Sequence, residues 1–564
     1  MKKFLALLLA FLLLLSLAAC SSSQPAQSET TESTQTDVDT TESTQTDVDT
    51  TESAQTTVDG HYYGGTLVVA TKLEPTFYQT NYQWDGGVVY ISHNILSKLC
   101  AWDEDTKTIY PDLAESWENS DDLMTYTFHL REGVKWHDGE PFTAKDVKWT
   151  FENILEYGDQ AYTYAYVKMI DSVETPDDYT VVFHMAYPCG TFVESVADYQ
   201  GPDILPAHIY EGTDPYTNPA NQSPIGTGPF KFVEAKLGSY CKLEANPDYY
   251  GDGPYLDGII YNFIPDETTA MTAMEAGEAG WMTATPSFAE SARLATVDGM
   301  VVETQKTNIV QWTQFNMSEE AARPYISDVR VREAICWAID NQSIADILYL
   351  GYVKPSDNWY TSTVEWAVNR DVVYPGYDVD KANQILDDAG YERGSDGYRF
   401  ELTYRCFSTS IFGTTDIPTL VAQNLDAIGI KLNVEKYEWA VRAEYLDNNL
   451  EWDMCSAGGS RGPDPSSFAN VWSTSTSNKS RYYNEKVMEL FDEGTKYATQ
   501  EERAPYYKEI QKYFSEDIPS YNYIEYAYAR PHRAEYINFF WMPDCGYAAD
   551  HMLNTVEWTG GELK

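Results

Sequence analysis

The stretch YPDLAESWENSDDLMTYTFHLREGVKWHDGEPFTAKDVKWTFENI, residues 110–154, contains the signals that decide the fold. Its middle, MTYTFHL at 124–130, alternates polar and apolar side chains as a half-buried strand does. Gly133 then marks a turn, and Thr143 is placed to cap a helix over 144–154. Strand, turn and helix therefore follow one another within a short stretch of chain.

Strand-like segments lie on both sides of this stretch. GTLVVAT at 65–71 is typical of a buried strand, and VVYISHNILSKL at 88–99 has its apolar residues at helical spacing, which predicts a helix. Residues 170–185 and 228–246 each read as two strands joined at a turn-forming centre, so we expect two hairpins.

The second half of the chain has shorter alternating units. VRVREAICWAIDNQSIADILYLG at 329–351 predicts one helix ending at its glycine, and residues 379–390 predict another. Strand and helix signals alternate from 400 to 459, which predicts a mostly parallel sheet with helices on both faces. Two amphipathic helices and an aromatic strand at 520–531 follow.

The first twenty residues have the layout of a secretory signal. Lys2 and Lys3 precede an apolar run over 4–17, and LAAC ends at Cys20. This pattern resembles the bacterial lipobox, so we expect residues 1–19 to be a signal peptide and Cys20 to carry palmitate. The mature protein is then held on the extracytoplasmic face of the cell membrane by its lipid.

A polar repeat follows. TTESTQTDVD at 30–39 recurs at 40–49 and is echoed at 50–59, without an aromatic or basic residue. Such a composition cannot bury a core, so residues 20–60 are interpreted as a disordered linker.

The remaining 500 or so residues are aromatic-rich, since the chain has 44 Tyr and 15 Trp. This length exceeds one hydrophobic core, so at least two domains are expected. The net charge is −49 and no basic stripe interrupts it. Such a surface repels phosphate backbones, which argues against nucleic acid as a partner.

The cysteines suggest neither a metal cluster nor a disulfide framework. They are scattered, lack a C-x-x-C pair and, apart from Cys20, are odd in number, so most are expected to be small buried hydrophobes, with one extracytoplasmic disulfide left open. They are Cys100, Cys189, Cys241, Cys336, Cys406, Cys455 and Cys545. GTGPFK at 226–231 lacks the residues of a phosphate loop and is interpreted as a tight turn into a strand. No cofactor and no metal are predicted.

Several blocks together resemble a known family, the bacterial extracellular solute-binding proteins of family 5, which are the dipeptide, oligopeptide and nickel receptors of ABC importers. The blocks occur in the family's order and extend over nearly everything after residue 65. They are residues 110–154, PIGTGPFKFVE at 224–234, residues 243–266, VRVREAICWAID at 329–340, YDVDKANQILDDAGY at 377–391 and YNEKVMELFDEG at 483–494.

The resemblance implies an α/β fold, the two-lobe clamshell of type II periplasmic binding proteins, in the large family 5 variant with an extra subdomain in the first lobe. It implies lobe 1 over 61–325, with the subdomain at about 112–225, lobe 2 over 326–535, and a return of 536–564 to lobe 1. Such a protein is a monomer without enzymatic activity that closes on its solute and delivers it to the membrane permease of an ABC importer.

Peptides are the expected solute. In peptide-binding members of the family the ligand lies extended and pairs with backbone groups of the lobes, as an added strand does. An oligosaccharide or an anionic small molecule is the alternative solute.

A different class of function comes from DMCSAGGSRGPDPSSF at 453–468. It contains G-x-S-x-G with Ser460 in the position of a nucleophile, which is the pattern of a secreted serine hydrolase. The following P-D-P disfavours the helix that such an elbow needs. Only His532 and His551 lie downstream as bases. We therefore interpret the segment as a strand and a ligand-facing loop.

In peptide receptors this loop commonly carries an acid for the ammonium of the ligand. Here Arg461 or Gly462 occupies that point, and Asp464 is the only carboxylate in reach. Either Asp464 or another acid anchors an ammonium, or Arg461 binds an anionic group, or Arg461 is simply a solvated loop residue. Gly458 and Gly459 would admit the ligand backbone.

Other ligand contacts are expected by position in the family alone. Tyr521 and Tyr523 lie on the late aromatic strand, and Trp439 precedes a helix near the same loop. Glu74 and Tyr78 follow the first strand of lobe 1. Packing is the alternative role for each of them.

Overall fold

A computed structural model of the chain describes residues 56–84, 87–103, 108–198, 200–320, 323–408, 416–438, 441–461, 464–475, 478–539 and 553–560. Ser53–Lys564 form one compact unit. Several expectations lie outside the described residues, namely those for the signal peptide, Cys20, the repeat segment up to residue 55, Trp439, Gly462, Cys545 and His551.

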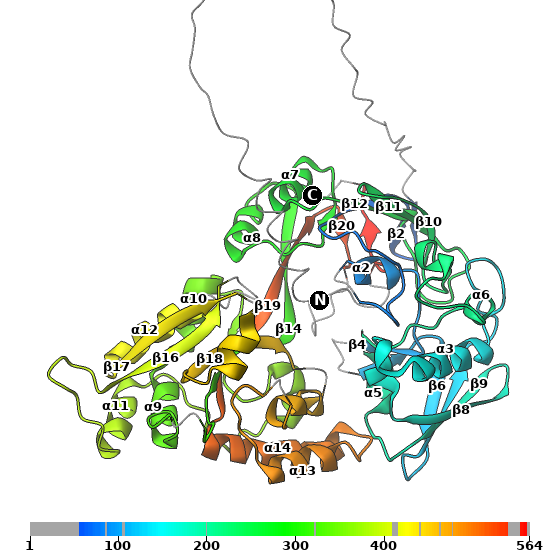
Figure 1. The fold of residues 1–564 in the computed structure, drawn as a ribbon. Coiled ribbons are helices and arrows are strands. Elements are labelled where there is room, and N and C mark those ends of the chain that lie inside the picture. The colour runs from blue at the N-terminus through cyan, green and yellow to red at the C-terminus, as the bar shows by residue number, and fades with distance from the viewer. Residues whose placement is uncertain are drawn as a thin grey trace, which may run out of the picture. The chain divides into compact units, whose positions relative to one another are not determined.

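One large sheet runs through the described part of the chain (Figure 1). Its order is β10-β11-β12-β3-β13-β19-β14-β18-β16-β17, with the short β15 (Lys354–Pro355) beside β19. The strands are β3 (Thr66–Thr71), β10 (Phe230–Lys236), β11 (Tyr240–Ala245), β12 (Gly258–Phe263), β13 (Trp281–Met282), β14 (Met300–Phe315), β16 (Phe400–Phe407), β17 (Ile430–Tyr437), β18 (Met454–Ser460) and β19 (Ser520–Arg533).

The centre of this sheet is antiparallel. β14 and β19 pair along most of their length, from Met300 opposite Arg533 to Gln314 opposite Ser520. β18 also pairs antiparallel with β14, whereas β16 pairs parallel with both β17 and β18. The expected parallel pairing is confirmed for the strands of residues 400–459, whereas the centre of the sheet differs, because its two longest strands, β14 and β19, form an antiparallel pair.

The protein has two main hydrophobic cores. One is built from residues 67–261 with Trp281 and a few side chains near the C-terminus, and the other from residues 309–528. We call the parts around these cores lobe 1 and lobe 2. Lobe 1 includes a separate four-stranded sheet, β6-β7-β9-β8, with β6 (Ala114–Asn119), β7 (Thr125–Leu130), β8 (Ile170–Asp177) and β9 (Thr180–Met185). This sheet and its helices make up the part drawn in cyan in Figure 1, and its standing as a subdomain at about 112–225 stays a prediction.

In lobe 1, the elements predicted from capping and turn residues are present. Helix α3 (Ala144–Tyr157) follows Thr143, and a capping box joins Thr143 to Asp146. Each such cap stabilises a helix by about 1 kcal/mol. The hairpins β8–β9 and β10–β11 are present as predicted.

The predicted helix over 88–99 is wrong beyond its first turn, since α2 spans only Val89–Ser92. The carbonyl groups of Asn94 and Ile95 accept hydrogen bonds from Phe230 and Gly228 instead of continuing the helix. Gly226 and Gly228 allow this approach, because a Cβ on Gly226 would lie 1.8 Å from the Ile95 oxygen. The turn at 226–231 is thus confirmed, and its tertiary pairing overrides the helical pattern.

The prediction of one helix over residues 329–351, in lobe 2, is also wrong. The segment predicted as one helix is two, α9 (Val329–Ala338) and α10 (Asn341–Tyr349). Asp340 caps α10 by accepting a hydrogen bond from the Ser343 amide, so the break has a local cause.

The other lobe 2 helices agree with the sequence pattern. They are α11 (Val379–Asp388), α12 (Ile417–Ala427), α13 (Glu485–Gly494) and α14 (Gln500–Asp517). None of the helices in the described residues is long and apolar enough to cross a membrane. Six cysteines are buried there, as expected for small hydrophobes: Cys100, Cys189, Cys241, Cys336, Cys406 and Cys455.

Both ends of the described chain pack on lobe 1. β1 (Thr56–Val58), at the end of the repeat segment, pairs with β2 (His61–Tyr63). Near the C-terminus, β20 (Tyr536–Ile537) pairs with β21 (Glu557–Trp558). The Glu557 carboxylate accepts a hydrogen bond from the Tyr62 amide, which holds the two ends together.

Candidate ligand-binding site

Within the described residues, strand β18 has one backbone edge that is only partly paired. On one side it pairs with β14 along its whole length, with Ala457 opposite Trp312 and Ser460 opposite Ile309. On the other side β16 reaches only Met454 and Cys455. No described strand pairs with β18 beyond Cys455 on that side, so its backbone groups from residue 456 onward can accept an added strand.

The predicted glycines lie on this edge. A Cβ on Gly458 would come 2.5 Å from the Gln311 side chain, so glycine is required there for close packing. At Gly459 the nearest atom is 4.0 Å away, on Trp312, and the position is open. The face of β18 is therefore open at Gly459 and tightly packed against Gln311 at Gly458.

Arg461 follows the last residue of β18 and turns inward, with only 7% of its surface exposed. Its guanidinium carbon lies 3.6 Å from the Phe468 ring centroid and 4.0 Å from that of Trp312. Both rings supply cation–π attraction to a cation removed from water. The alternative of a solvated loop residue is therefore wrong for this side chain.

One polar group orients Arg461. Its Nη2 donates a hydrogen bond of 3.2 Å to Asn522 Oδ1. The Asn522 amide nitrogen donates to the carbonyl groups of Asn358 and Trp359, so the oxygen is the atom left for Arg461. Asn522 is neutral, however, and cannot balance the charge.

The charge of Arg461 has no counter-charge within the described residues, because no described carboxylate lies within 4.0 Å of it and Nε has no hydrogen-bond partner there. Burial lowers the pKa of Arg461 to about 9, since removal from water disfavours the cation. An uncompensated buried charge is destabilising. We therefore expect an anionic group outside the described residues to balance the charge of Arg461 when a ligand is bound.

Further donors beside Arg461 also lack partners. Nε1 of Trp312, Nε1 of Trp359 and the hydroxyl of Tyr360 are buried and make no hydrogen bond with described residues. Burial raises the pKa of Tyr360, so its hydroxyl stays neutral and can donate. Buried polar groups are usually satisfied, and four unsatisfied donors in one neighbourhood indicate a missing acceptor.

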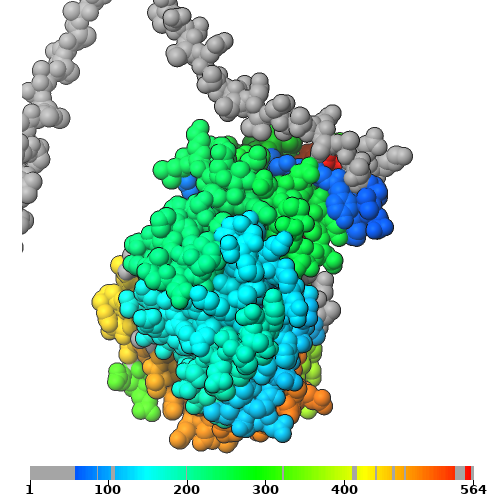
Figure 2. All heavy atoms as spheres, turned by 90° about the vertical axis from the view of Figure 1, so that its right-hand side faces the viewer, coloured from blue at the N-terminus to red at the C-terminus, as the bar shows by residue number. Residues whose placement is uncertain are grey.

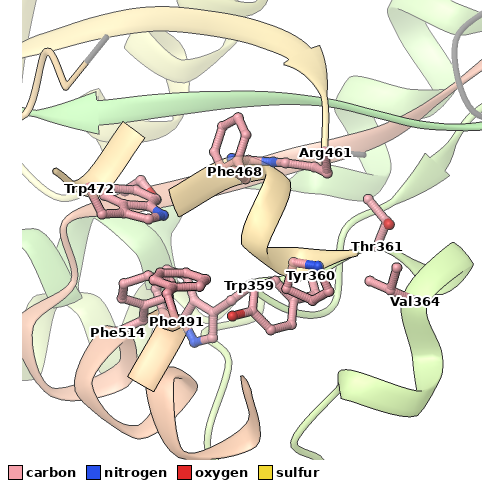
Figure 3. Close-up of a pocket in the computed structure, with 11 residues that line it drawn as sticks. Trp359, Tyr360, Thr361, Val364, Arg461, Phe468, Trp472, Phe491 and Phe514 are labelled. Carbon is pink, nitrogen blue, oxygen red and sulfur yellow. The ribbon is translucent and has the colours of Figure 1, made fainter. Parts of the chain in front are cut away.

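Arg461, Trp359, Tyr360 and Phe468 line a small cavity (Figure 3). The Arg461 side chain extends toward Phe468 on one side, and Trp359 and Tyr360 lie on the other. The cavity volume is about 10 Å³. This is about the space that one water molecule needs, so the cavity admits a small group rather than a whole solute. Its other lining residues are Thr361, Val364, Pro465, Trp472, Phe491, Phe514 and Ser520.

Asp464 is already engaged within the protein. It caps the 3₁₀ helix Pro465–Trp472 through the Ser466 amide and accepts a hydrogen bond of 2.7 Å from the Tyr507 hydroxyl. Its other oxygen lies 3.1 Å from Arg503 Nε, an ion contact that is not aligned as a hydrogen bond. Its role as an anchor for a ligand ammonium therefore stays a prediction and would require breaking these contacts.

Arg503 also connects the two lobes. From α14 in lobe 2, its Nη2 lies 2.5 Å from Oε1 of Glu194 on α5 (Phe192–Ala197) of lobe 1. Next to this pair, the Gly190 amide donates to the Thr495 carbonyl, and a Cβ on Gly190 would lie 2.0 Å from the Tyr497 oxygen. In Figure 2, cyan residues of lobe 1 accordingly lie against orange residues of lobe 2.

Within the described residues, the strand register keeps the candidate base His532 far from Ser460. Along β14, Ser460 pairs opposite Ile309 and His532 opposite Val301. Eight positions of extended strand separate the two by roughly 25 Å, so His532 cannot take a proton from Ser460.

The remaining predicted residues lie elsewhere. Tyr521 and Tyr523 belong to the lobe 2 core, where their hydroxyl groups meet the Pro375 carbonyl and the Tyr404 hydroxyl. In lobe 1, Glu74 accepts a hydrogen bond from the Gly238 amide, and Tyr78 is buried against Phe232. Contact of these four residues with a solute stays a prediction.

Sequence reasoning missed the partners of Arg461. Trp312 and Asn522 come from distant segments, and the pairing of β14 with β18 and β19 brings them to Arg461, whereas Phe468 lies seven residues further along the same segment. The unassigned segment 359–360 contributes the other side of the cavity. Only the strand register, which cannot be read from the sequence, could have identified Trp312 and Asn522.

Comparisons with known proteins identify the family. Residues 108–480 match the model of the bacterial extracellular solute-binding proteins, family 5 Middle. The chain is a family 5 extracellular solute-binding protein. Family membership confirms the resemblance found in the sequence and the two-lobe clamshell fold expected from it.

Individual relatives differ in what they bind. The oligopeptide-binding protein AppA of Bacillus subtilis is 29% identical over 490 residues, which span 82% of this chain and 86% of that protein. Heme-binding protein A of Haemophilus influenzae is 30% identical over 74% of this chain and 79% of its own length.

Solved structures agree with the fold. The ABC transporter substrate-binding protein CtaP of Listeria monocytogenes superposes with a TM-score of 0.78 at 25% identity, over 88% of this chain and 100% of that one. AppA of Bacillus subtilis in complex with a nonapeptide superposes with a TM-score of 0.66 at 26% identity, over 88% and 99%.

Proposed function

We propose that this family 5 protein is the peptide receptor of an ABC importer, anchored outside the cytoplasm through a lipid on Cys20. It captures an extended peptide between lobes 1 and 2, closes, and delivers the peptide to a membrane permease. The lobes are proposed to comprise residues 61–325 and 326–535, with 536–564 returning to lobe 1. No catalytic step is part of this proposal.

The single observation that most supports a peptide is the free edge of β18. An extended peptide can pair with its backbone from residue 456 to residue 460, where Gly459 leaves space for close approach. Backbone pairing is independent of side-chain identity, which suits a receptor for many sequences. Relatives in complex with peptides, such as AppA with a nonapeptide and DppA of Helicobacter pylori with the peptide STSA, point in the same direction.

Lobe closure is supported by the contact at Arg503. Its ion pair with Glu194 joins lobe 2 to lobe 1, and its contact with Asp464 lies three residues from Arg461. A solute bound at Arg461 thereby also affects the contact between the lobes.

The proposal is tested by peptide capture. A chain starting at Ser21 keeps the whole compact unit Ser53–Lys564. Incubated with a tryptic digest of casein, repurified and released by acid, it is expected to yield bound peptides by mass spectrometry. The digest should also raise its melting temperature, because a ligand at 100 times its Kd stabilises the folded state by about 2.7 kcal/mol.

A matched digest of dextran serves as the control for the alternative solute. Capture of oligosaccharides and not of peptides would replace the peptide with a sugar. Capture from neither pool, with no change in melting temperature, would contradict the proposal.

A further inference from the structure

The geometry points to a carboxylate as the group that this receptor holds at Arg461, and we infer that its peptides bind with that carboxylate inserted between Arg461, Trp359 and Tyr360. This inference rests on the proposed function and names the chemistry of the ligand's anchored end.

The positive charge of Arg461 favours a negatively charged group on the ligand. Only 7% of the surface of Arg461 is exposed, and Arg461 has no counter-charge among the described residues. The acid nearest in sequence, Asp464, is occupied by Arg503, Tyr507 and the Ser466 amide. A ligand anion would therefore be the first counter-charge that Arg461 meets in this site.

The shape of the surroundings decides how that anion approaches. Trp312 and Phe468 lie over the guanidinium at 4.0 Å and 3.6 Å, and Asn522 occupies one hydrogen of Nη2. Nε is left without a partner in the described structure. An anion must then bind in the plane of the guanidinium, where a planar carboxylate matches the two parallel N–H donors of the fork.

The size of the cavity decides how much of the ligand enters. A volume of about 10 Å³ has room for one small group, not for a side chain with its backbone. The Tyr360 hydroxyl and the Trp359 indole nitrogen, both unpartnered, add donors to the same space. The site therefore suits an end group rich in acceptors, with the rest of the ligand outside.

The free edge of β18 relates this end group to the peptide. The edge ends at Ser460, and Arg461 is the next residue, so a peptide paired along β18 brings one end to Arg461. The carboxylate can be the carboxyl terminus or the side chain of an Asp or Glu near that end. Both have the same chemistry, and synthetic variants distinguish them.

The test compares two pools of the same casein peptides, one untreated and one converted to methyl esters, which removes every carboxylate and leaves the ammonium groups. The chain from Ser21 is expected to capture the untreated peptides and to bind their esters about 100-fold more weakly, as expected for the loss of one partner of a buried charge pair. Captured peptides are then synthesised with only the carboxyl terminus amidated, or only the acidic side chains esterified, to identify the carboxylate that is held.

Variants assign the effect to Arg461. Arg461→Met is expected to lose about 100-fold in affinity for the untreated peptides and to show no preference over the esters. Arg461→Lys keeps the charge without the planar fork and should lose about 10-fold. Arg330→Met, at an exposed arginine paired with Asp328, is the control and should bind like the unmodified protein. If Arg461→Met does not fold, the loss of about 10-fold and the smaller preference for untreated peptides over esters in Arg461→Lys are the readout, and binding by Arg461→Lys equal to that of the unmodified protein overturns the inference.

Each outcome is decisive. Equal capture of untreated and esterified peptides, or unchanged binding by a folded Arg461→Met variant, would overturn the carboxylate while leaving the peptide function intact. Capture of nothing from either pool would remove the peptide function, and this inference with it.

Discussion

Two buried arginines of lobe 2 have opposite surroundings. Arg503 lies between two carboxylates, with Glu194 at 2.5 Å and Asp464 at 3.1 Å. Arg461, almost as deeply buried, has two aromatic rings and a neutral amide instead. Burial alone therefore does not show whether an arginine has a structural role or a ligand-binding role. Arg503 belongs to a charge network inside the protein, whereas Arg461 has no counter-charge among the described residues and can pair with an anion of the ligand.

The largest effect is expected at Arg503. Arg503→Met leaves Glu194 and Asp464 close together without their shared cation, so we expect a loss of roughly 3–5 kcal/mol in the free energy of unfolding. Chemical denaturation of the chain from Ser21 measures this loss. Arg330→Met, at a solvated ion pair, should change it by no more than about 1 kcal/mol.

A partner variant sharpens this result. Adding Glu194→Gln to Arg503→Met removes one of the two unbalanced carboxylates and should restore part of the stability. Full stability of Arg503→Met by itself would mean that the network between the lobes contributes nothing to folding.

A smaller effect of opposite sign is expected at Arg461. In the ligand-free protein, Arg461→Met replaces an uncompensated cation with an apolar side chain between Trp312 and Phe468. The free energy of unfolding should stay the same or rise by about 1 kcal/mol, because the cost of burying an unpaired charge disappears. The same denaturation experiment measures it. A loss as large as that of Arg503→Met would indicate that Arg461 is a structural residue and would remove the contrast.

The sequence predicted best where local chemistry decides the structure. Thr143 and Asp146 form their capping box, and the hairpins turn where the turn residues lie. The errors arose where distant segments compete, as when the strand after Gly228 takes the carbonyl groups that a helix over 88–99 would need. The break at Asp340 is a local signal that the helical periodicity on both sides concealed.

The candidate site was predictable only in part. Arg461, Gly458 and Gly459 could be selected because they lie in one loop that departs from the family pattern. Their surroundings could not, because Trp312 meets Arg461 only through the register that pairs it with Ala457. That no described carboxylate pairs with Arg461 is likewise a property of the folded state, since Asp464 is near in sequence and yet engaged by Arg503.

The central claim is that Arg461 holds the carboxylate of a peptide. Calorimetric titration of one captured peptide, as the acid and as the variant lacking the held carboxylate, into the unmodified protein and into Arg461→Met tests it most directly. We predict that removing the carboxylate weakens binding about 100-fold in the unmodified protein and hardly at all in Arg461→Met, a coupling of more than about 2 kcal/mol. Equal weakening in both proteins would contradict the account.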